Sequence, residues 1–351
     1  MNNIILIPFY NNHIKVLKPI ADKLIKDGKY DPITIHLEYG DLIKSFYYPY
    51  NIPLLRSTRK TLRKLMAHYL PSVLIITGLG FTERLLLSFK IPSIYISSAI
   101  PSLNTTIKDA GFVRDYLCSL LYGLPLGRKV IKPTYTIAWN DSYKKSLMLK
   151  GFSEKQIMVY GSPLHDGFYN RPPENNNQRI ILVTTQPMAQ YKYCTMETHR
   201  KYIESVVNVC AKLPNSQIIV KVHPKENVRD YDYLRGRCLV LNGDSDIDKL
   251  ISSASVVVNH SSTCGIATTL SGKPLITYHY DGYPDVPVEL TGAGIDVYDE
   301  SQLLSVLVDT LDNKMGILYQ LRRDEYIKRK FPMFDGKATE RIVDLIYRMV
   351  E

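Results

Sequence analysis

SVVVNHSSTCGIATTLSGKPLITYH, residues 255–279, contains two short apolar runs separated by a stretch of helix length. The first run, Val256–Val258, is followed by a polar turn, and Gly272-Lys273-Pro274 precedes the second run. Strands that are almost wholly apolar and alternate with helices are typical of a parallel sheet covered on both faces. The segment therefore predicts one strand–helix–strand unit of an α/β fold.

The same alternation runs through both halves of the chain. In the first half it begins with IILIPF (4–9), and it restarts with RIILVTT (179–185) after the polar, proline-bearing stretch RPPENNNQ (171–178). Each half contains enough strand and helix segments for a separate layered domain. We therefore expect two Rossmann-like βα domains, residues 1–170 and 171–334.

The end of the chain is expected to be a helix that packs back on the body of the protein. Residues 335–351 carry apolar side chains at helical spacing, including Ile342, Val343, Leu345 and Ile346. A helix of this kind buries one face.

The composition is that of a globular protein of 351 residues, 45% of them hydrophobic. No apolar run reaches the roughly 18 residues that cross a bilayer, and the N-terminus lacks the basic region and cleavage site of a signal peptide. We therefore expect a cytoplasmic protein. The five cysteines form no CxxC pair, which argues against a disulfide framework and a zinc site.

The net charge of +10 is concentrated in the first half. Residues 1–170 carry 22 Lys and Arg against 11 Asp and Glu, whereas residues 171–351 carry 22 against 23. This asymmetry fits an anionic partner, such as a phosphorylated acceptor, a membrane surface or nucleic acid, but also a lysine-rich solubilising surface.

The amphipathic helix expected at residues 54–70 also has two explanations. It could lie on anionic lipid at the inner face of the membrane, or it could be the solvated side of a packed helix.

Polar residues follow the apolar runs of the second half, where an open parallel sheet binds ligands. Thr185 and Gln186 follow one run, His223 and Pro224 follow another, and the turn at residues 260–263 follows a third. This turn begins a helix expected at about 262–271, whose unpaired N–H groups and dipole favour an anion. Serine and threonine are also the usual N-cap residues, so a cap with nothing bound is the alternative.

These motifs resemble the nucleotide-binding domain of GT-B glycosyltransferases. The HP, SS and GKP pattern at residues 223–224, 261–262 and 272–274 is most similar to bacterial sialyltransferases, capsule Kdo transferases and polyol-phosphate transferases. GFSEKQIMVYGSPLHD (151–166) and DGKATERI (335–342) also match passages of this superfamily. The resemblance implies a GT-B fold, in which an N-terminal acceptor-binding domain and a C-terminal nucleotide-sugar-binding domain face each other across a cleft.

The resemblance also implies an activity and a set of binding residues. The expected enzyme is an inverting, metal-independent glycosyltransferase that moves a sugar from a UDP-sugar to a saccharide, lipid-linked or protein-linked acceptor. Glu289 is a candidate for the donor ribose, although a loop glutamate is usually only solvated. The expected nucleotide-sugar-binding residues are Thr185, Gln186, Lys221, His223, Pro224, His260, Ser261, Ser262, Thr263 and Glu289.

Two residues of the first half are candidates for the catalytic base. The segment IPFYNNHIKVLKPIADKL (7–24) resembles the first strand, loop and helix of nucleotide-sugar glycosyltransferases whose histidine deprotonates the acceptor, which here corresponds to His13. Sialyl- and Kdo-type members use an acidic residue instead, and Glu83 or Asp41 could serve. A first-turn acid that stabilises its helix dipole is the simpler explanation of Glu83.

Three other functions remain open at this point. A UDP-GlcNAc 2-epimerase shares the scaffold, and YHYDGY (278–283) resembles the corresponding segment of polyol-phosphate transferases. From another class, a nucleic-acid-binding module would fit the basic first half. The sequence contains no recognised nucleic-acid motif, so we expect no nucleic-acid partner. The sequence also has no DxD pair at a strand end, with DSDID (244–248) the nearest match.

Overall fold

The computed structural model describes residues 3–8, 11–30, 32–37, 51–54, 59–79, 81–97, 132–169, 179–260, 262–283 and 293–351. The chain forms two compact units. The first unit is Met1–Gly167 together with Lys330–Glu351, and the second is Phe168–Arg329. Each unit contains its own parallel β-sheet, which confirms the α/β prediction.

The sheet of the first unit has seven described strands in the order β3-β2-β1-β4-β5-β6-β7. Every pair of neighbours is parallel. The order reverses between β1 and β4, as in a Rossmann fold, and such a switch point is where open sheets bind ligands. The strands are β1 (Asn3–Ile7), β2 (Pro32–Leu37), β3 (Asn51–Leu54), β4 (Pro71–Ile76), β5 (Ser93–Ile96), β6 (Tyr135–Ala138) and β7 (Ile157–Val159).

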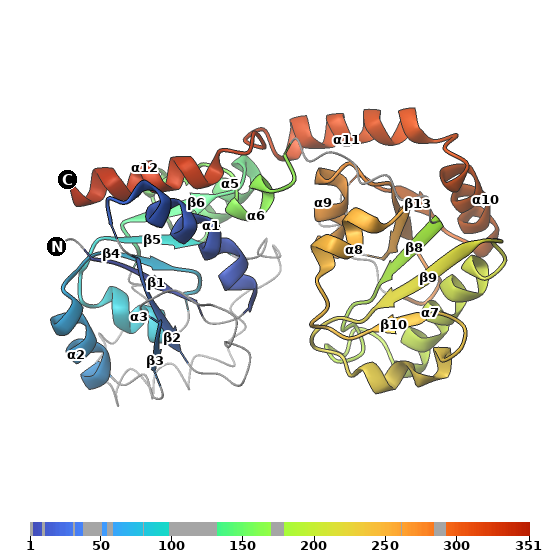
Figure 1. Ribbon diagram of the computed structural model, residues 1–351, viewed down its shortest axis with the longest axis horizontal. Helices are drawn as coiled ribbons and strands as arrows, with labels where there is room; N and C mark the ends of the chain where they lie inside the picture. The colour runs from blue at the N-terminus through green and yellow to red at the C-terminus, as the bar shows by residue number, and fades with distance from the viewer. Residues whose placement is uncertain are drawn as a thin grey trace. The chain divides into compact units, whose positions relative to one another are not determined.

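Helices cover both faces of this sheet (Figure 1). One face packs against α1 (Asn11–Asp27) and α12 (Ala338–Val350), and the other against α2 (Arg59–Tyr69) and α3 (Phe81–Leu87). Successive residues of a strand point to opposite faces, so these strands are apolar at nearly every position. The unit also contains α5 (Asp141–Leu149), the 3-10 helix η3 (Glu154–Gln156) and α6 (Pro163–Asp166).

The N-terminus of the C-terminal helix α12 is capped by a carboxylate from the end of the first segment of the unit, Met1–Gly167. Asp166 accepts hydrogen bonds from the backbone N–H groups of Ala338 (3.1 Å) and Thr339 (2.7 Å), the first residues of α12. These N–H groups have no partner within the helix, so the carboxylate caps them. The segments 151–166 and 335–342, far apart in the sequence, therefore meet in the folded chain.

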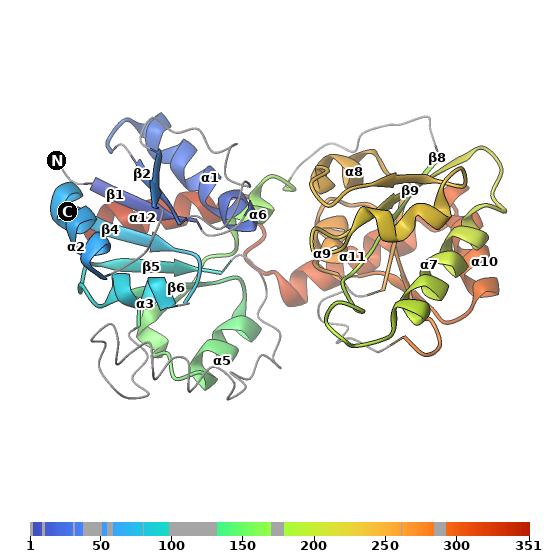
Figure 2. The same ribbon diagram turned by 90° about the horizontal axis from the view of Figure 1, so that it is seen from below.

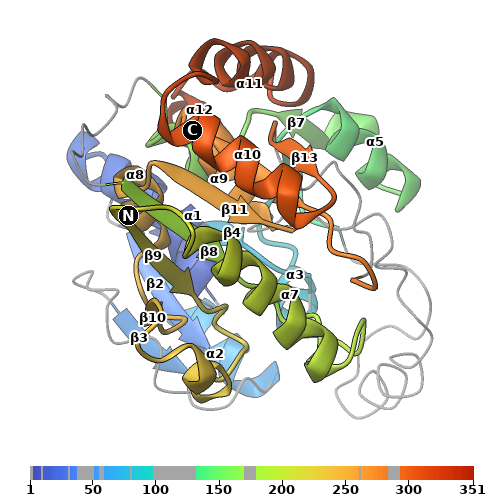
Figure 3. The ribbon, with the colours of Figure 1, turned by 90° about the vertical axis from the view of Figure 1, so that its right-hand side faces the viewer.

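The second unit contains six described strands in the order β10-β9-β8-β11-β12-β13, all parallel. Figure 3 shows β10, β9, β8 and β11 side by side. This is the Rossmann order, with its switch point between β8 and β11. The strands are β8 (Arg179–Thr184), β9 (Ser216–Lys221), β10 (Leu239–Leu241), β11 (Val256–Asn259), β12 (Leu275–Tyr278) and β13 (Ile295–Val297).

Helices also cover both faces of the second sheet (Figure 2). On β11, Val256 and Val258 pack toward α7 (Met196–Cys210) and α10 (Glu300–Leu311), and Val257 packs toward α8 (Ile247–Ser253) and α9 (Thr263–Leu270). All three valines are completely buried, so the strand–helix–strand prediction for residues 255–279 is confirmed. The unit also contains the 3-10 helix η4 (Val228–Leu234) and most of α11 (Gly316–Lys330).

Within the basic segment at residues 54–70, Leu54 ends β3, and the helix α2 covers only Arg59–Tyr69. Its apolar residues Leu62 and Met66 are buried in the core of the first unit, whereas Lys60, Arg63 and Lys64 are exposed. No described helix is both long and apolar enough to cross a membrane.

Candidate functional site

The candidate site lies at the carboxyl ends of β9, β8 and β11, around the switch point of the second sheet. Thr185 and Gln186 directly follow β8, and both are buried. His223 follows β9 by two residues, and Ser262 and Thr263 come after β11. Ser261 and Glu289 lie outside the described residues, as does the alternative base Asp41.

The turn after β11 ends in the expected helix N-cap. The Ser262 hydroxyl accepts the backbone N–H of Cys264 at 3.2 Å, and α9 begins at the exposed Thr263. The capping hydroxyl satisfies one of the four N–H groups that a helix start leaves without an internal partner. The N-terminus of α9 therefore combines a capped first turn with the positive end of the helix dipole.

After β9, the sequence His223-Pro224-Lys225-Glu226 forms a closed turn. The Glu226 N–H donates to the His223 carbonyl at 2.9 Å, and the Lys225 N–H donates to His223 Nδ1 at 3.1 Å. The His223 N–H donates to the Thr185 hydroxyl oxygen at 2.9 Å and to Glu226 Oε2 at 3.2 Å. Because Nδ1 accepts a hydrogen bond, the neutral imidazole carries its hydrogen on Nε2.

Electrostatics keep this imidazole neutral. Burial is the main reason that the pKa of His223 is below its usual value, and the nearby Lys221 and Lys225 ammonium groups lower it further, against the opposing effect of Glu226. A neutral ring with hydrogen on Nε2 is a hydrogen-bond donor on that side.

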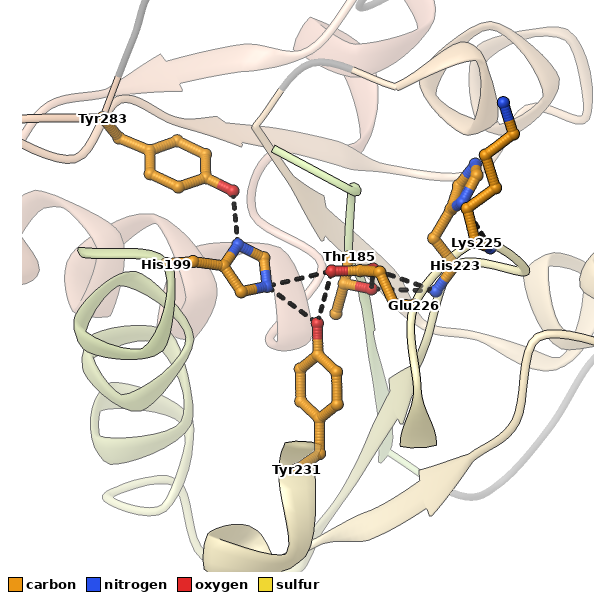
Figure 4. Close-up of polar contacts among 7 residues, drawn as sticks. All are labelled: Thr185, His199, His223, Lys225, Glu226, Tyr231 and Tyr283. Atoms are coloured by element: carbon orange, nitrogen blue, oxygen red, sulfur yellow. Dashed lines mark hydrogen bonds and ion pairs between the residues drawn. The ribbon is translucent and has the colours of Figure 1, made fainter. Parts of the chain in front are cut away.

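Glu226 is the central residue that the sequence motifs did not single out. Its carboxylate accepts hydrogen bonds from the Thr185 hydroxyl and from the Tyr231 hydroxyl (2.8 Å), and it pairs with His199 Nε2 at 3.1 Å. Burial would raise its pKa, but the hydrogen bonds from His199, Thr185 and Tyr231 outweigh burial and hold the pKa below its usual value. Figure 4 shows these groups around the carboxylate, with the His223 and Lys225 side chains pointing away from them.

His199 connects Glu226 to the loop after β12. Its Nε2 lies 2.7 Å from the Tyr231 hydroxyl oxygen, and its Nδ1 lies 2.8 Å from the Tyr283 hydroxyl oxygen. Burial raises the pKa of both tyrosines, so both stay protonated. The network therefore joins the ends of β8, β9 and β12 through one histidine of α7.

Lys221, one of the expected binding residues, supports loops in this structure. The buried Lys221 ammonium donates to the carbonyl oxygens of Val222 (3.0 Å) and Gly243 (2.7 Å). Gly243 must be glycine, because a Cβ there would overlap Pro224 Cα. Lys221 thus holds the loop after β10 against the His223–Pro224 peptide.

His260 is almost completely buried, with 2% of its surface exposed. Its Nδ1 lies 3.1 Å from the Tyr278 carbonyl oxygen, and since a carbonyl only accepts, Nδ1 carries hydrogen. The ring packs edge-on against Tyr202 and Tyr283. The His260 ring is therefore part of the interior of the second unit, packed among tyrosines and bonded to the end of β12.

Polar side chains also form a row across the sheet at this edge. Thr184, Asn259 and Thr277 stand side by side on β8, β11 and β12, because Val183 pairs with Val258 and Asn259 with Thr277. All three are at least 98% buried, and among the described residues neither the Asn259 amide nor the two hydroxyls have a hydrogen-bond partner. Buried polar groups without a partner cost roughly 1–3 kcal/mol each, so the row suits a polar ligand better than an apolar one.

The two expected catalytic residues both lie at the switch point of the first sheet. His13 is in the first turn of α1, after β1, and Glu83 is in the first turn of α3, after β4. The Thr77 hydroxyl donates to the Ile7 carbonyl (3.2 Å) and lies 2.7 Å from His13 Nδ1, so Nδ1 is the donor and Nε2 the basic nitrogen. Burial lowers the pKa of His13 to about 4, so the ring is neutral at pH 7.

Glu83 is 5% exposed and lies against the loop that holds Thr77. A Cβ on Gly78 would overlap the Glu83 carboxylate, so the glycine lets this carboxylate approach the backbone closely. Its position in the first turn of α3 also stabilises the helix dipole. Among the described residues, no group of three or more His, Cys, Asp and Glu side chains is arranged to hold a metal ion.

No protein-family model matches the chain, and no curated protein matches its sequence. Solved structures do match over nearly its whole length. UDP-GlcNAc 2-epimerase from Neisseria meningitidis bound to UDP-GlcNAc has a TM-score of 0.67 at 14% identity, covering 99% of this chain and 100% of that chain. The wall teichoic acid polymerase TagF has a TM-score of 0.67 at 13% identity, covering 99% of this chain and 89% of that chain. The glycotransferase of kitacinnamycin has a TM-score of 0.59 at 15% identity, covering 99% of both chains.

These matches show that the chain has the GT-B fold, with two Rossmann-like α/β units. The matched proteins are enzymes, and the fold is one used by enzymes of nucleotide sugars. At 13–15% identity, the similarity establishes the fold and not the reaction.

Proposed function

We propose that the chain is a glycosyltransferase of the GT-B type. It transfers a sugar from a nucleotide sugar, preferably a UDP-sugar, to a saccharide, lipid-linked or protein-linked acceptor, with inversion and without a metal. One observation carries the proposal: His223, a donor through Nε2, and the N-terminus of α9 flank β8 at the switch point. Parallel strands are about 4.8 Å apart, so β9 and β11 are roughly 10 Å apart and one nucleotide can reach both.

In this proposal the second unit holds the donor and stabilises the leaving nucleotide. His223 Nε2 donates to its phosphate oxygens, and the positive end of the α9 dipole faces them, where negative charge develops as the glycosidic bond breaks. Ser261 and Thr263 contribute hydroxyls, Gln186 binds beside β8, and Glu289 contacts the ribose. Thr185, Lys221, Pro224, Ser262 and His260 act by shaping the turns that carry these donors.

The first unit binds the acceptor in this proposal. His13 or Glu83 accepts the hydrogen of the acceptor hydroxyl, and both lie at the carboxyl edge of the first sheet. The enzyme works in the cytoplasm, at the inner face of the membrane when its acceptor is lipid-linked.

A UDP-GlcNAc 2-epimerase is the second candidate. It is favoured by the similarity to the Neisseria meningitidis epimerase, whose structure contains UDP-GlcNAc. A polyol-phosphate transferase is a third, since the wall teichoic acid polymerase TagF also matches. Incubation with UDP-GlcNAc alone separates them. An epimerase changes the configuration of the sugar at C2 without an acceptor, and releases UDP only if water also cleaves the sugar–phosphate bond, whereas either transferase requires an acceptor.

The test is a thermal-shift screen of UDP, CDP, CMP, GDP, TDP and their sugars. A nucleotide that binds the folded protein at about 100 times its Kd adds roughly 2.7 kcal/mol of stability, and this raises the melting temperature. We expect His223→Ala to reduce the shift strongly and His68→Ala, on the exposed side of α2, to leave it unchanged. A nucleotide shift that persists in His223→Ala would refute the assigned site, and loss of transfer on adding a chelator would refute the metal-free mechanism.

A further inference from the structure

The His223–Glu226 turn is closed by its own last residue. The Glu226 N–H bonds the His223 carbonyl at 2.9 Å, and the Glu226 carboxylate accepts the His223 N–H at 3.2 Å. Between them, the Lys225 N–H donates to His223 Nδ1 at 3.1 Å. The conformation of the turn and the position of hydrogen on the imidazole are therefore coupled.

The carboxylate is itself held from outside the turn. Its side chain is completely buried and receives hydrogen bonds from Thr185 after β8 and Tyr231 in η4, while His199 of α7 pairs with it at 3.1 Å. A buried carboxylate with several charge-assisted hydrogen bonds is fixed in position, because each lost bond would leave a buried charge poorly compensated.

We infer that Glu226 is a positioning residue for His223: it anchors the turn to β8, η4 and α7 and so keeps the imidazole hydrogen on Nε2, facing outward as a donor. This inference rests on the proposed function only for the identity of the ligand, which is the anionic part of a nucleotide bound by His223 Nε2. Without the carboxylate, the His223 N–H keeps the Thr185 oxygen, but the turn loses its link to Tyr231 and His199. The Lys225 N–H then no longer stays on Nδ1, and both tautomers of His223 become populated.

Glutamine is the informative substitution at this position. In Glu226→Gln, the amide oxygen can accept from His223 and Thr185, and the amide nitrogen can face Tyr231 and His199, whose ring can accept when neutral. The variant thus removes the charge but keeps the anchor. Glu226→Leu removes both the charge and the hydrogen bonds that anchor the turn, and its side chain is of similar size.

The experiment reads the tautomer directly. The protein is labelled with ¹⁵N-histidine, the signals of His223 among the eight histidines are assigned by their loss in His223→Gln, and the two ring nitrogens are compared across variants. We expect one tautomer, with hydrogen on Nε2, in the wild type and in Glu226→Gln, and a mixture in Glu226→Leu. UDP and CMP serve as probes, and we expect at least about a tenfold loss of affinity for the nucleotide that binds, in Glu226→Leu only.

A matched pair of tyrosines provides the control. Tyr231→Phe removes a hydrogen bond to Glu226 and should produce a smaller change of the same kind. Tyr233→Phe, on the same helix η4 but with a hydroxyl that has no hydrogen-bond partner in the described part of the chain, should leave the spectrum and the affinity unchanged. If Glu226→Leu does not fold, Tyr231→Phe decides: a spectrum identical to that of Tyr233→Phe would overturn the inference.

The two proposals fail separately. If the tautomer responds as expected but the wild type binds neither UDP nor CMP, the positioning role stands and the nucleotide site falls. If a nucleotide binds and folded Glu226→Leu keeps both the single tautomer and the affinity, the positioning role is wrong and the nucleotide site stands.

Discussion

His165 in α6 is a buried histidine that makes the first unit sensitive to acid. Its ring packs edge-on against Trp139 and Phe331, with centroids 5.0 Å and 5.4 Å away. Burial lowers its pKa from 6.5 to about 4, so the unfolded chain binds a proton at pH values where the folded chain does not. Protonation of His165 therefore does not affect the free energy of unfolding above pH 6.5. As the pH falls from 6.5 toward 4, the unfolded chain takes up the proton first, and the free energy of unfolding decreases.

We expect His165→Phe to reduce the loss of stability on acidification. The shift from 6.5 to about 4 corresponds to roughly 3 kcal/mol between the two protonation states. Chemical denaturation at pH 7.0 and at about pH 4.5 measures the difference, and the variant should lose less of its free energy of unfolding than the wild type. His68→Phe, at an exposed site, is the control. Equal losses in His165→Phe and the wild type would contradict the assignment.

At this scale, residues whose role depends on their own turn could be predicted, and residues whose role depends on distant partners could not. Ser262 was expected at the start of a helix, because N-capping uses only neighbouring N–H groups. Glu226 was missed, since its partners Thr185 and His199 come from other elements and no local pattern marks them. The only signal in the sequence was a charged residue two positions after Pro224 in an otherwise recognised motif.

At the scale of elements, α2 shows how an amphipathic pattern leaves two explanations open. The sequence predicts the helix but not what its apolar side contacts. In the structure, Leu62 and Met66 are buried in the core of the first unit, so the apolar side of α2 packs against the protein itself. Any contact of α2 with a membrane therefore depends on its exposed basic residues, and such electrostatic binding is screened by salt.

We expect the protein to bind vesicles containing anionic lipid weakly, and to lose this binding at high salt. Reversing the charges in Lys60→Glu/Arg63→Glu/Lys64→Glu should reduce it further, since each basic residue near the surface contributes about 1 kcal/mol. Sedimentation with anionic and neutral vesicles measures the effect, and Lys144→Glu/Lys145→Glu on α5 is the control. Binding that survives high salt would require buried apolar contact, and stronger binding to random oligonucleotides would favour the nucleic-acid alternative.

At the scale of the whole molecule, the two Rossmann-like units could be predicted from the sequence, because each strand is a local apolar run and the strands alternate with helices in both halves. The unit to which the C-terminal segment belongs could not be predicted, because this depends on contacts between residues far apart in the sequence. Residues Lys330–Glu351 belong to the first unit, where Ile342, Val343, Leu345 and Ile346 of α12 pack with α1 and the strands. The first unit is therefore discontinuous in sequence.

This discontinuity predicts that damage near the C-terminus weakens the N-terminal unit. Ile346 is completely buried in the core that contains β1 and β4, so Ile346→Ala should cost about 2–5 kcal/mol of stability. Hydrogen exchange should quicken in β1, β4 and α1, while β8 and β11 keep their protection because their core contains no residue of α12. Asp344→Ala, exposed on the same helix, should change neither. If exchange instead quickened equally in both units, their cores would unfold together and the two units would not be independent in stability.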